Sequence, residues 1–380
     1  MLIDRRFFTN FDWKLVLCVL AIPIFGLVVL YSAGYDPVDT VKLIEGKLFN
    51  LEIKSIPAMK QFLYLIAGLF IMILVSLIPT DFLKKYAYLI YFLTILLLIV
   101  VMVYGSISKG SRRWIDFGIL KLQPSEIAKI STMLAVARYL SQVATRELLS
   151  LKHLFVLSLL VLCPFLLIVA QPDLGTSLAV VFPAVAMILF IGVKFKILIT
   201  TFLLGIASIF PLWSFLAPYQ KRRVMALLNP DFDPLGAGYH IIQSKIAVGS
   251  GGLWGKGFLK GTQTQLSFLP EHTTDFIFSV LAEEWGFVGC LVLLFLYFIL
   301  LYKLLYIASK SSSLFATLIC VGVTSYIFFH VLVNIGMVIG LLPVVGIPLP
   351  LFSYGGSSML STMAALGIVL GISIRKNFFK

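Results

Sequence analysis

The most restrictive feature of this sequence is a succession of apolar runs, each long enough to cross a lipid bilayer. A helix of about 20 apolar residues spans the hydrocarbon core of a membrane. Backbone polar groups inside lipid must bond within their own segment, so such runs predict helices. We predict an all-α polytopic membrane protein with about ten transmembrane helices, near residues 13–32, 61–79, 86–104, 125–143, 153–170, 176–193, 197–216, 276–302, 314–341 and 357–374.

The composition excludes an ordinary water-soluble protein. Of the 380 residues, 60% are apolar and 12% are charged, against roughly 45–50% apolar residues in soluble domains. The formal charge of +13 does not indicate nucleic-acid binding, because lysine and arginine occur in short clusters between apolar runs and form no continuous stripe. We expect no nucleic acid among the partners, and we expect residues 1–380 to form a single membrane domain.

Basic residues in the short loops predict the orientation of the chain. Cytoplasmic loops are enriched in lysine and arginine, and the loops at 80–85, 144–152, 194–196 and 303–310 each carry a basic pair. This pattern predicts that both termini are cytoplasmic. The opposite loops are also positively charged, and 105–122 balances its cations with Asp116 alone. A cationic outer surface predicts an anionic partner on that side.

One connection is much longer than the others. Residues 217–275 form a predicted extracytoplasmic loop between helices 7 and 8, and a connection of that length is usually functional or disordered. Its amphipathic stretch Ile241–Val248 and its aromatic residues predict a segment folded on the membrane surface. The stretch from Ser250 to Gly257 resembles a phosphate-binding loop, but Ser250 replaces the first glycine and Gly257 follows Lys256, so no nucleotide site is predicted.

Charged residues in or beside the apolar runs are the candidate functional residues, because an Asp or Lys at the centre of a membrane helix costs about 2.5–3.5 kcal/mol. Glu126 and Lys129 lie three residues apart and can form an ion pair on one helix face. Asp173 opens the sixth predicted helix, where it can serve as a helix cap. Asp275 opens the eighth, with a neighbouring threonine as the expected cap and its carboxylate in the first turn.

Two further groups of polar residues lie inside apolar runs. Glu283 and Glu284 rank below Asp275, and at least one is expected to be satisfied by a neighbouring helix. Tyr326, His330 and Asn334 recur every four residues and therefore share one helix face. Such residues usually form hydrogen bonds between membrane helices.

A turn rich in proline and glycine follows, and such backbone is tolerated at membrane depth only against protein or a polar cavity. The stretch from Asn334 through Gly346 to Ser358 resembles the signature of the SEDS proteins (shape, elongation, division and sporulation), the bacterial RodA and FtsW family. Other blocks agree with this resemblance along nearly the whole chain: Arg112-Arg113-Trp114-Ile115 with Gln123-Pro124-Ser125-Glu126, Gln171-Pro172-Asp173-Leu174-Gly175-Thr176, and Gly255-Lys256-Gly257 through Gly261-Thr262-Gln263 to Asp275-Phe276-Ile277-Phe278.

The resemblance implies a peptidoglycan glycosyltransferase that polymerises lipid II at the outer face of the bacterial cytoplasmic membrane. It implies a class B penicillin-binding protein transpeptidase as a partner, and the Gly261-Thr262-Gln263 block resembles the RodA branch, which serves the elongation machinery and rod shape. It implies no organic cofactor and no metal ligand, and it leaves open whether a divalent cation assists. The site residues that it implies are Asp275 as general base or acceptor-positioning group, Glu126, Lys129 and Asp173 in a polar cavity, and Arg112, Arg113, Trp114, Lys221, Arg222 and Arg223 as substrate-binding residues.

This sequence departs from the family pattern beside the aspartate. The family usually places histidine two positions before it, where this chain has Thr273, and the histidine here is His272. A mechanism that requires that imidazole is disfavoured, whereas one that requires only the carboxylate is unaffected. Two alternatives stay open: a lipid II flippase or transporter, which would use the intramembrane charges, and a non-catalytic scaffold for a penicillin-binding protein, which would explain the outer loop but not the acids.

Overall fold

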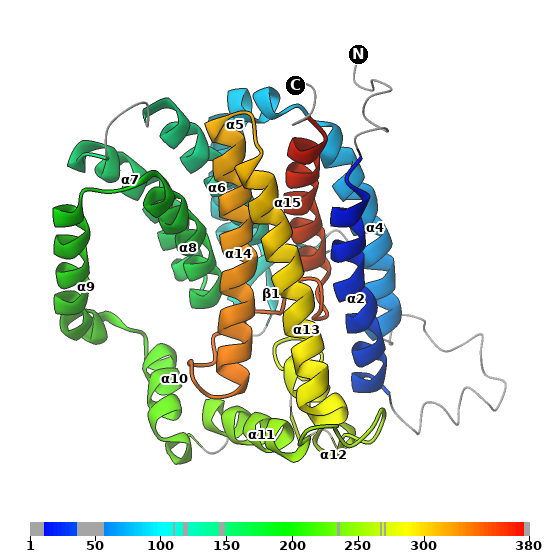
Figure 1. The fold of residues 1–380 in the computed structure, drawn as a ribbon. Coiled ribbons are helices and arrows are strands. Elements are labelled where there is room, and N and C mark those ends of the chain that lie inside the picture. The colour runs from blue at the N-terminus through cyan, green and yellow to red at the C-terminus, as the bar shows by residue number, and fades with distance from the viewer. Residues whose placement is uncertain are drawn as a thin grey trace.

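The chain folds into a bundle of long helices (Figure 1). The computed structural model describes residues 11–35, 57–108, 111–116, 121–143, 149–233, 236–266, 268–269 and 271–375. Within these ranges, ten helices have 18 residues or more: α2 (Trp13–Ala33), α4 (Pro57–Leu77), α5 (Thr80–Tyr104), α6 (Pro124–Val143), α7 (Leu151–Ala170), α8 (Leu174–Ile191), α9 (Phe195–Phe215), α13 (Ile277–Ser309), α14 (Leu314–Val338) and α15 (Gly356–Arg375).

Eight of these helices are long and apolar enough to cross a membrane, which confirms a polytopic helical membrane protein. The other two are α6, which carries Glu126, Lys129 and Arg138, and α9, whose apolar part is the shorter stretch Phe195–Ser208. Ten crossings therefore stay a prediction. The most apolar windows of α14 and α15 are 78% and 83% buried, against 22% for α5 and α7, so α14 and α15 form the centre of the bundle.

Two predicted loops prove to be helical. The stretch 80–85 belongs to α5, which begins at Thr80 and has Asp81 in its first turn, where a carboxylate stabilises the helix dipole. The stretch 303–310 largely belongs to α13, which runs to Ser309. Lys303 is accommodated inside that helix because its Nζ lies 3.1 Å from the Asp12 Oδ1 at the start of α2.

The long segment between α9 and α13 is folded, as predicted. It contains α10 (Pro218–Leu228), the 3₁₀ helix η2 (Pro230–Phe232), α11 (Ala237–Ser250) and α12 (Thr262–Gln265). These helices lie at the end of the bundle opposite to the start of α2 and the end of α15 (Figure 1). The predicted stretch Ile241–Val248 lies in α11, which buries Ile241, Ser244 and Ala247. Its position on the membrane surface stays a prediction.

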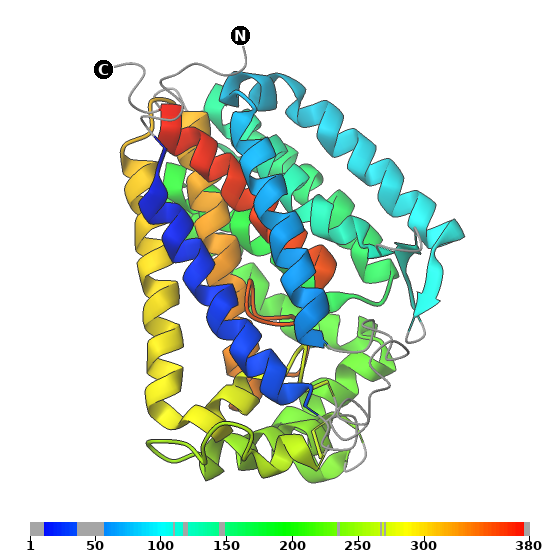
Figure 2. The ribbon, with the colours of Figure 1, turned by 90° about the vertical axis from the view of Figure 1, so that its right-hand side faces the viewer.

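A small antiparallel sheet, which the sequence did not indicate, connects α5 to α6. Its strands are β1 (Ser106–Ser108), β2 (Ser111–Asp116) and β3 (Lys121–Leu122), in the order β1-β2-β3. Ser106 pairs with Trp114, and Ile115 pairs with Leu122. Figure 2 shows the sheet at the margin of the bundle, beyond the end of α5. The sheet fixes the position of Arg112 and Arg113, which lie on its central strand.

Helix α13 is broken at Gly286, whose backbone has φ 64° and ψ −161°. A break inside a membrane helix leaves backbone groups that must find other partners. The loop after α11 supplies all four partners in two pairs of hydrogen bonds: Lys256 N to Glu283 O (2.9 Å) and Gly257 N to Glu284 O (3.0 Å), then Phe287 N to Gly252 O (2.9 Å) and Val288 N to Leu253 O (3.2 Å). The glycine-rich sequence that resembled a phosphate-binding loop therefore forms backbone hydrogen bonds with the broken part of α13.

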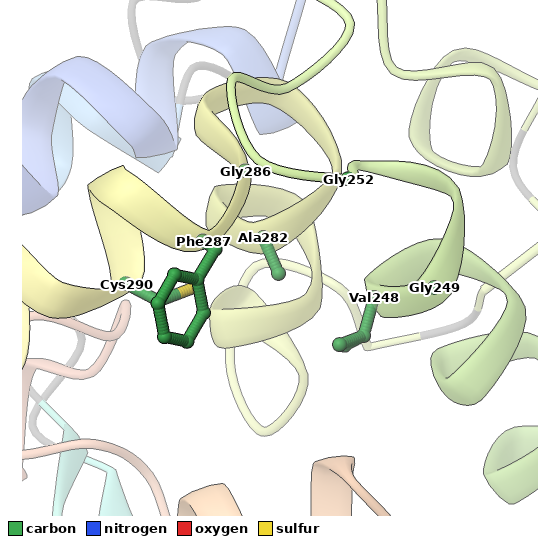
Figure 3. Close-up of a pocket in the computed structure, with 7 residues that line it drawn as sticks. All are labelled: Val248, Gly249, Gly252, Ala282, Gly286, Phe287 and Cys290. Carbon is green, nitrogen blue, oxygen red and sulfur yellow. The ribbon is translucent and has the colours of Figure 1, made fainter.

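An apolar cavity of about 140 Å³ lies beside this break (Figure 3). Figure 3 shows the ring of Phe287 and the small side chains of Cys290, Ala282 and Val248 around it. Gly249, Gly252 and Gly286 complete the lining, which includes no charged residue. This cavity therefore lacks the groups needed for sugar or phosphate chemistry.

We expect Gly286→Ala to destabilise the protein strongly. The new Cβ would lie 2.3 Å from the Gly255 nitrogen, and this φ and ψ combination costs other residues about 1–3 kcal/mol even without a clash. Thermal unfolding in detergent, followed by circular dichroism, measures the loss. Gly249→Ala on α11 is the matched control, because its Cβ would meet nothing within 4 Å. Equal midpoints for the two variants would contradict the proposed role of the break.

Candidate active site

Asp275 lies in the turn that precedes α13. The prediction that it occupies the first turn of the helix is therefore wrong. Phe276 is the N-cap residue and makes no side-chain capping bond. Thr274 does not cap the helix either, because its hydroxyl bonds to Glu271 within the turn. Asp275 lies outside the helix because the Phe276 nitrogen bonds to the Glu271 carbonyl at 3.3 Å and closes a separate turn before the helix begins.

The segment between α14 and α15 packs around this turn. Gly346 has φ 72°, and a Cβ at that position would lie 3.3 Å from the Asp275 Oδ2. The Tyr354 nitrogen donates to the Thr273 carbonyl at 3.0 Å. The carboxylate of Asp275 therefore lies against the backbone of the Gly- and Pro-rich turn that the sequence placed at membrane depth.

Asp173 caps α8, as predicted, and also contacts a cation. Its Oδ1 accepts from the Thr176 nitrogen at 3.1 Å, and its Oδ2 lies 3.5 Å from Arg113 Nη1. Gln123 donates to the same Oδ2 at 3.3 Å. Arg113 is also held by the carbonyls of Gln171 and Pro172. Two motifs that are distant in sequence thus meet at one carboxylate.

The Asp173 motif and Asp275 lie against the same turn. A Cβ on Gly175 would lie 2.8 Å from the Val345 carbonyl oxygen, so α8 approaches the turn as closely as a glycine allows. Gly346, the next residue of that turn, contacts Asp275. The turn therefore places the two acidic groups near one another at the same end of the bundle.

Arg223 from α10 completes this group. Its guanidinium is half-buried and lies 5.7 Å from the centre of the Tyr219 ring. Burial lowers the pKa of Arg223, against the raising effect of Tyr219. The charges of Arg113, Asp275 and Asp173 also act on this pKa, so the four side chains share one electrostatic environment. An arginine remains charged at neutral pH even with a lowered pKa.

The other predicted substrate-binding residues make their contacts elsewhere. Lys221 bonds to the Ser214 carbonyl at 3.4 Å, and Arg222 is exposed. Arg112 is exposed and donates to the Val103 carbonyl at 3.0 Å. Trp114 lies in β2, where its carbonyl accepts from the Ser106 hydroxyl at 3.1 Å. Of the predicted cations on this side, Arg113 and Arg223 are thus the two that the structure brings to the acids.

Glu126 and Lys129 form the predicted ion pair, deep in the bundle. The Lys129 Nζ lies 2.8 Å from the Glu126 Oε1, and the two residues are 1% and 5% exposed. Ser361 donates to the other Glu126 oxygen at 2.6 Å. Lys129 also lies 3.4 Å from the His330 Nε2 and 4.8 Å from the centre of the Tyr326 ring. The predicted polar face of α14 is thereby confirmed as a surface that contacts α6.

We expect Lys129→Met to lower the thermal unfolding midpoint sharply, because it leaves the buried Glu126 uncompensated. Breaking such a pair costs about 3–5 kcal/mol, whereas replacing both partners is often nearly neutral. The double variant Glu126→Gln/Lys129→Met should therefore recover much of the loss. A double variant that melts no higher than Lys129→Met would contradict this account.

Glu283 contacts the loop after α11, Glu284 contacts α2, and neither belongs to the Asp275 group. Glu283 is 0% exposed, and its Oε1 lies 2.6 Å from the Lys256 Nζ. Glu284 accepts from the Ser32 hydroxyl of α2 at 2.5 Å. The expectation that a neighbouring helix satisfies at least one of them is confirmed.

Two histidines lie near the Asp275 turn. Both ring nitrogens of His272 face backbone carbonyls, Leu269 O at 2.7 Å and Ala33 O at 2.9 Å, so this imidazole links the turn to α2. His240 of α11, which our sequence analysis missed, stacks on Phe276 at 5.7 Å between ring centres. Burial lowers the pKa of His240. No motif marks His240 in the sequence, because only the docking of α11 brings it beside Phe276.

The described residues contain no group of three His, Cys, Asp or Glu side chains that could hold a metal ion. The structure therefore points to no particular place for a divalent cation. The chemistry available at the site comes from one half-exposed carboxylate, Asp275, and the two cations Arg113 and Arg223.

Comparisons with known proteins agree along nearly the whole chain. The peptidoglycan glycosyltransferase MrdB of Escherichia coli K12 is 45% identical over 365 residues, which are 96% of this chain and 93% of that protein. The peptidoglycan glycosyltransferase RodA of Treponema pallidum is 33% identical and covers 97% of this chain and 98% of its own length.

Solved structures show the same fold. A chain from a peptidoglycan synthase complex that coordinates polymerization and crosslinking matches with a TM-score of 0.79 and 35% identity, over 97% of this chain and 98% of that one. The crystal structure of the rod shape determining protein RodA of Thermus thermophilus matches with a TM-score of 0.70 and 32% identity, with the same coverage. The family model for FtsW, RodA and SpoVE, described as cell cycle proteins, matches residues 12–377, and this chain therefore belongs to that family, the SEDS proteins.

Proposed function

We propose that this chain is a peptidoglycan glycosyltransferase that polymerises lipid II into glycan strands during cell elongation and the maintenance of rod shape. The names of its relatives support this activity. The structural observation that carries the proposal is the packing of the Arg113–Asp173 ion pair and of Asp275 around one turn at one end of the bundle, with Arg223 within electrostatic range. These residues come from four segments that are distant in sequence.

The proposed reaction joins an acceptor sugar hydroxyl to the anomeric carbon of a sugar pyrophosphate. A new carbon–oxygen bond forms at that carbon, its bond to the pyrophosphate oxygen breaks, and the lipid pyrophosphate leaves. Asp275 accepts the hydroxyl proton or positions the hydroxyl. Arg113 and Arg223 stabilise the negative charge that develops on the leaving group. Asp173 holds Arg113 in place, and Glu126 with Lys129 forms the polar interior behind the site.

The site lies at the outer face of the cytoplasmic membrane in this proposal, with both termini inside. The start of α2 and the end of α15 meet at one end of the bundle, where Ser373 donates to Asp12 at 2.7 Å. Lys303, near the end of α13, also pairs with Asp12 there. Asp275 precedes the other end of α13, so it lies on the opposite side of the membrane from these groups.

A class B penicillin-binding protein transpeptidase is the proposed partner, within the elongation machinery. The similar chain in the solved peptidoglycan synthase complex supports this proposal, since that complex coordinates polymerization with crosslinking. A transpeptidase acts on the strands that a polymerase makes, so the two activities are expected side by side.

The test is polymerisation of purified lipid II by the purified protein with its transpeptidase partner, read as glycan polymer on a gel. We expect polymer in detergent, where no membrane separates two compartments. Movement of lipid II across sealed vesicles without polymer would instead establish a flippase. Neither polymer nor movement of lipid II, from a preparation shown to be folded, would favour a scaffold.

A further inference from the structure

Asn334 connects Asp275 itself to the turn between α14 and α15. It is 0% exposed, and its Nδ2 donates to two backbone carbonyls, those of Asp275 and Ile347, each at 2.8 Å. The amide orientation follows from these two acceptors, because a flipped amide would place its oxygen against both carbonyls. The Oδ1 atom is buried and accepts no hydrogen bond from the described residues.

The two carbonyls belong to the two segments that define the site. Asp275 carries the carboxylate, and Ile347 follows Gly346, whose backbone lies against that carboxylate. Helices α13 and α14 are neighbours in the bundle (Figure 1). The hydrogen bonds of Asn334 thus set the distance between the main chain of Asp275 and the turn against which its side chain rests.

One other hydrogen bond joins the same two segments, from the Tyr354 nitrogen to the Thr273 carbonyl at 3.0 Å, but it does not contact Asp275. Thr274 bonds only within its own turn, to Glu271, and His272 connects that turn to α2. His330, one turn before Asn334 on α14, lies 3.3 Å from the Pro348 carbonyl but faces Lys129 with its other nitrogen. Asn334 alone of the α14 polar face contacts the residue that carries the proposed catalytic group, as far as the described contacts show.

From this geometry we infer that Asn334 is a positioning residue for glycosyl transfer, which acts by holding Asp275 in register with the Gly346 turn. The inference rests on the proposed function and on the role of Asp275 in it. It differs from a general role in folding, because it predicts a defect in turnover after substrate has bound. A displacement of about 1 Å at a reacting group can reduce turnover roughly 100-fold.

The test is Asn334→Asp, which has nearly the same shape but replaces the Nδ2 donor with a carboxylate oxygen, so that an acceptor faces the two carbonyl oxygens. We expect kcat for lipid II polymerisation to fall about 100-fold with KM changed little. The thermal midpoint should fall as well, because the new carboxylate is buried against two carbonyl oxygens. Asn334→Ser, which keeps one hydroxyl donor, carries the same test if the first variant is not recovered from membranes. Thr324→Val is the matched control, since it removes a buried hydrogen bond on α14, to the Cys320 carbonyl, away from the site.

A double variant separates the positioning role from a structural one. If Asn334 acts through Asp275, then Asn334→Asp should cause no further loss of the residual rate in an Asp275→Asn background. Independent losses that multiply would overturn the inference, and so would a wild-type kcat for Asn334→Asp. Full activity of Asp275→Asn itself would instead refute the proposed role of that acid, so the two failures are distinguishable.

Discussion

Asp275→Asn should slow the formation of glycan polymer by about 10²–10⁴-fold while leaving the protein folded in the membrane. The substitution removes the carboxylate that lies against Gly346, and a general base typically contributes that much to the rate. The fold should survive because the contact of Asn334 is with the Asp275 main-chain carbonyl, which asparagine retains. The measurement is gel analysis of polymer from purified lipid II, with the thermal midpoint determined on the same preparation.

Asp231→Asn is the matched control for this prediction. Asp231 lies in the same outer segment, in η2, and is exposed. Its substitution changes the net charge of the outer surface by the same amount but leaves the site intact, so polymer should form at the wild-type rate. Polymer from Asp275→Asn at an undiminished rate would refute the assignment of the base.

Arg223→Gln should have the second largest effect. Arg223 is the half-buried cation that shares its surroundings with Asp275, Asp173 and Arg113. A cation that stabilises a developing negative charge contributes about 10²–10³-fold to turnover, so kcat/KM should fall by about 100-fold. Arg223→Lys should recover part of this, because lysine keeps the charge but lacks the planar pair of donors.

The neighbouring Arg222 provides an unusually close control. Arg222 is exposed on the same helix, so Arg222→Gln removes the same charge one residue away and should change kcat/KM by only about twofold, as expected for a screened surface charge. Comparable losses in the two variants would mean that the outer segment acts through its overall charge, and the specific role of Arg223 would then be wrong.

The two predictions also show where sequence reasoning reached its limit. Lys221, Arg222 and Arg223 form one basic cluster in the sequence, and nothing in their order separates them. The helical turn of α10 separates them, because it places Arg223 half-buried over the Tyr219 ring while Arg222 is exposed. In the same way, Arg112 and Arg113 are adjacent in the sequence, but Arg112 bonds to the Val103 carbonyl and Arg113 to the Gln171 carbonyl.

Local patterns in the sequence were sufficient for several features. Apolar runs predicted the long helices, since lipid leaves few other ways to satisfy the backbone. Spacing of three residues predicted the pair of Glu126 and Lys129, and the position of Asp173 before a helix predicted its cap. Each of these depends on interactions within about one helical turn, which neighbouring residues determine.

Only the tertiary structure decided the features that depend on distant segments. The break of α13 at Gly286 requires the loop at 252–257 to supply its four missing backbone partners. The surroundings of Asp275 require Gly346 and Asn334 from beyond the next helix. The sequence by itself thus determined a helical membrane protein and its candidate acids, whereas packing decided which cations meet those acids, because that choice depends on contacts between segments far apart along the chain.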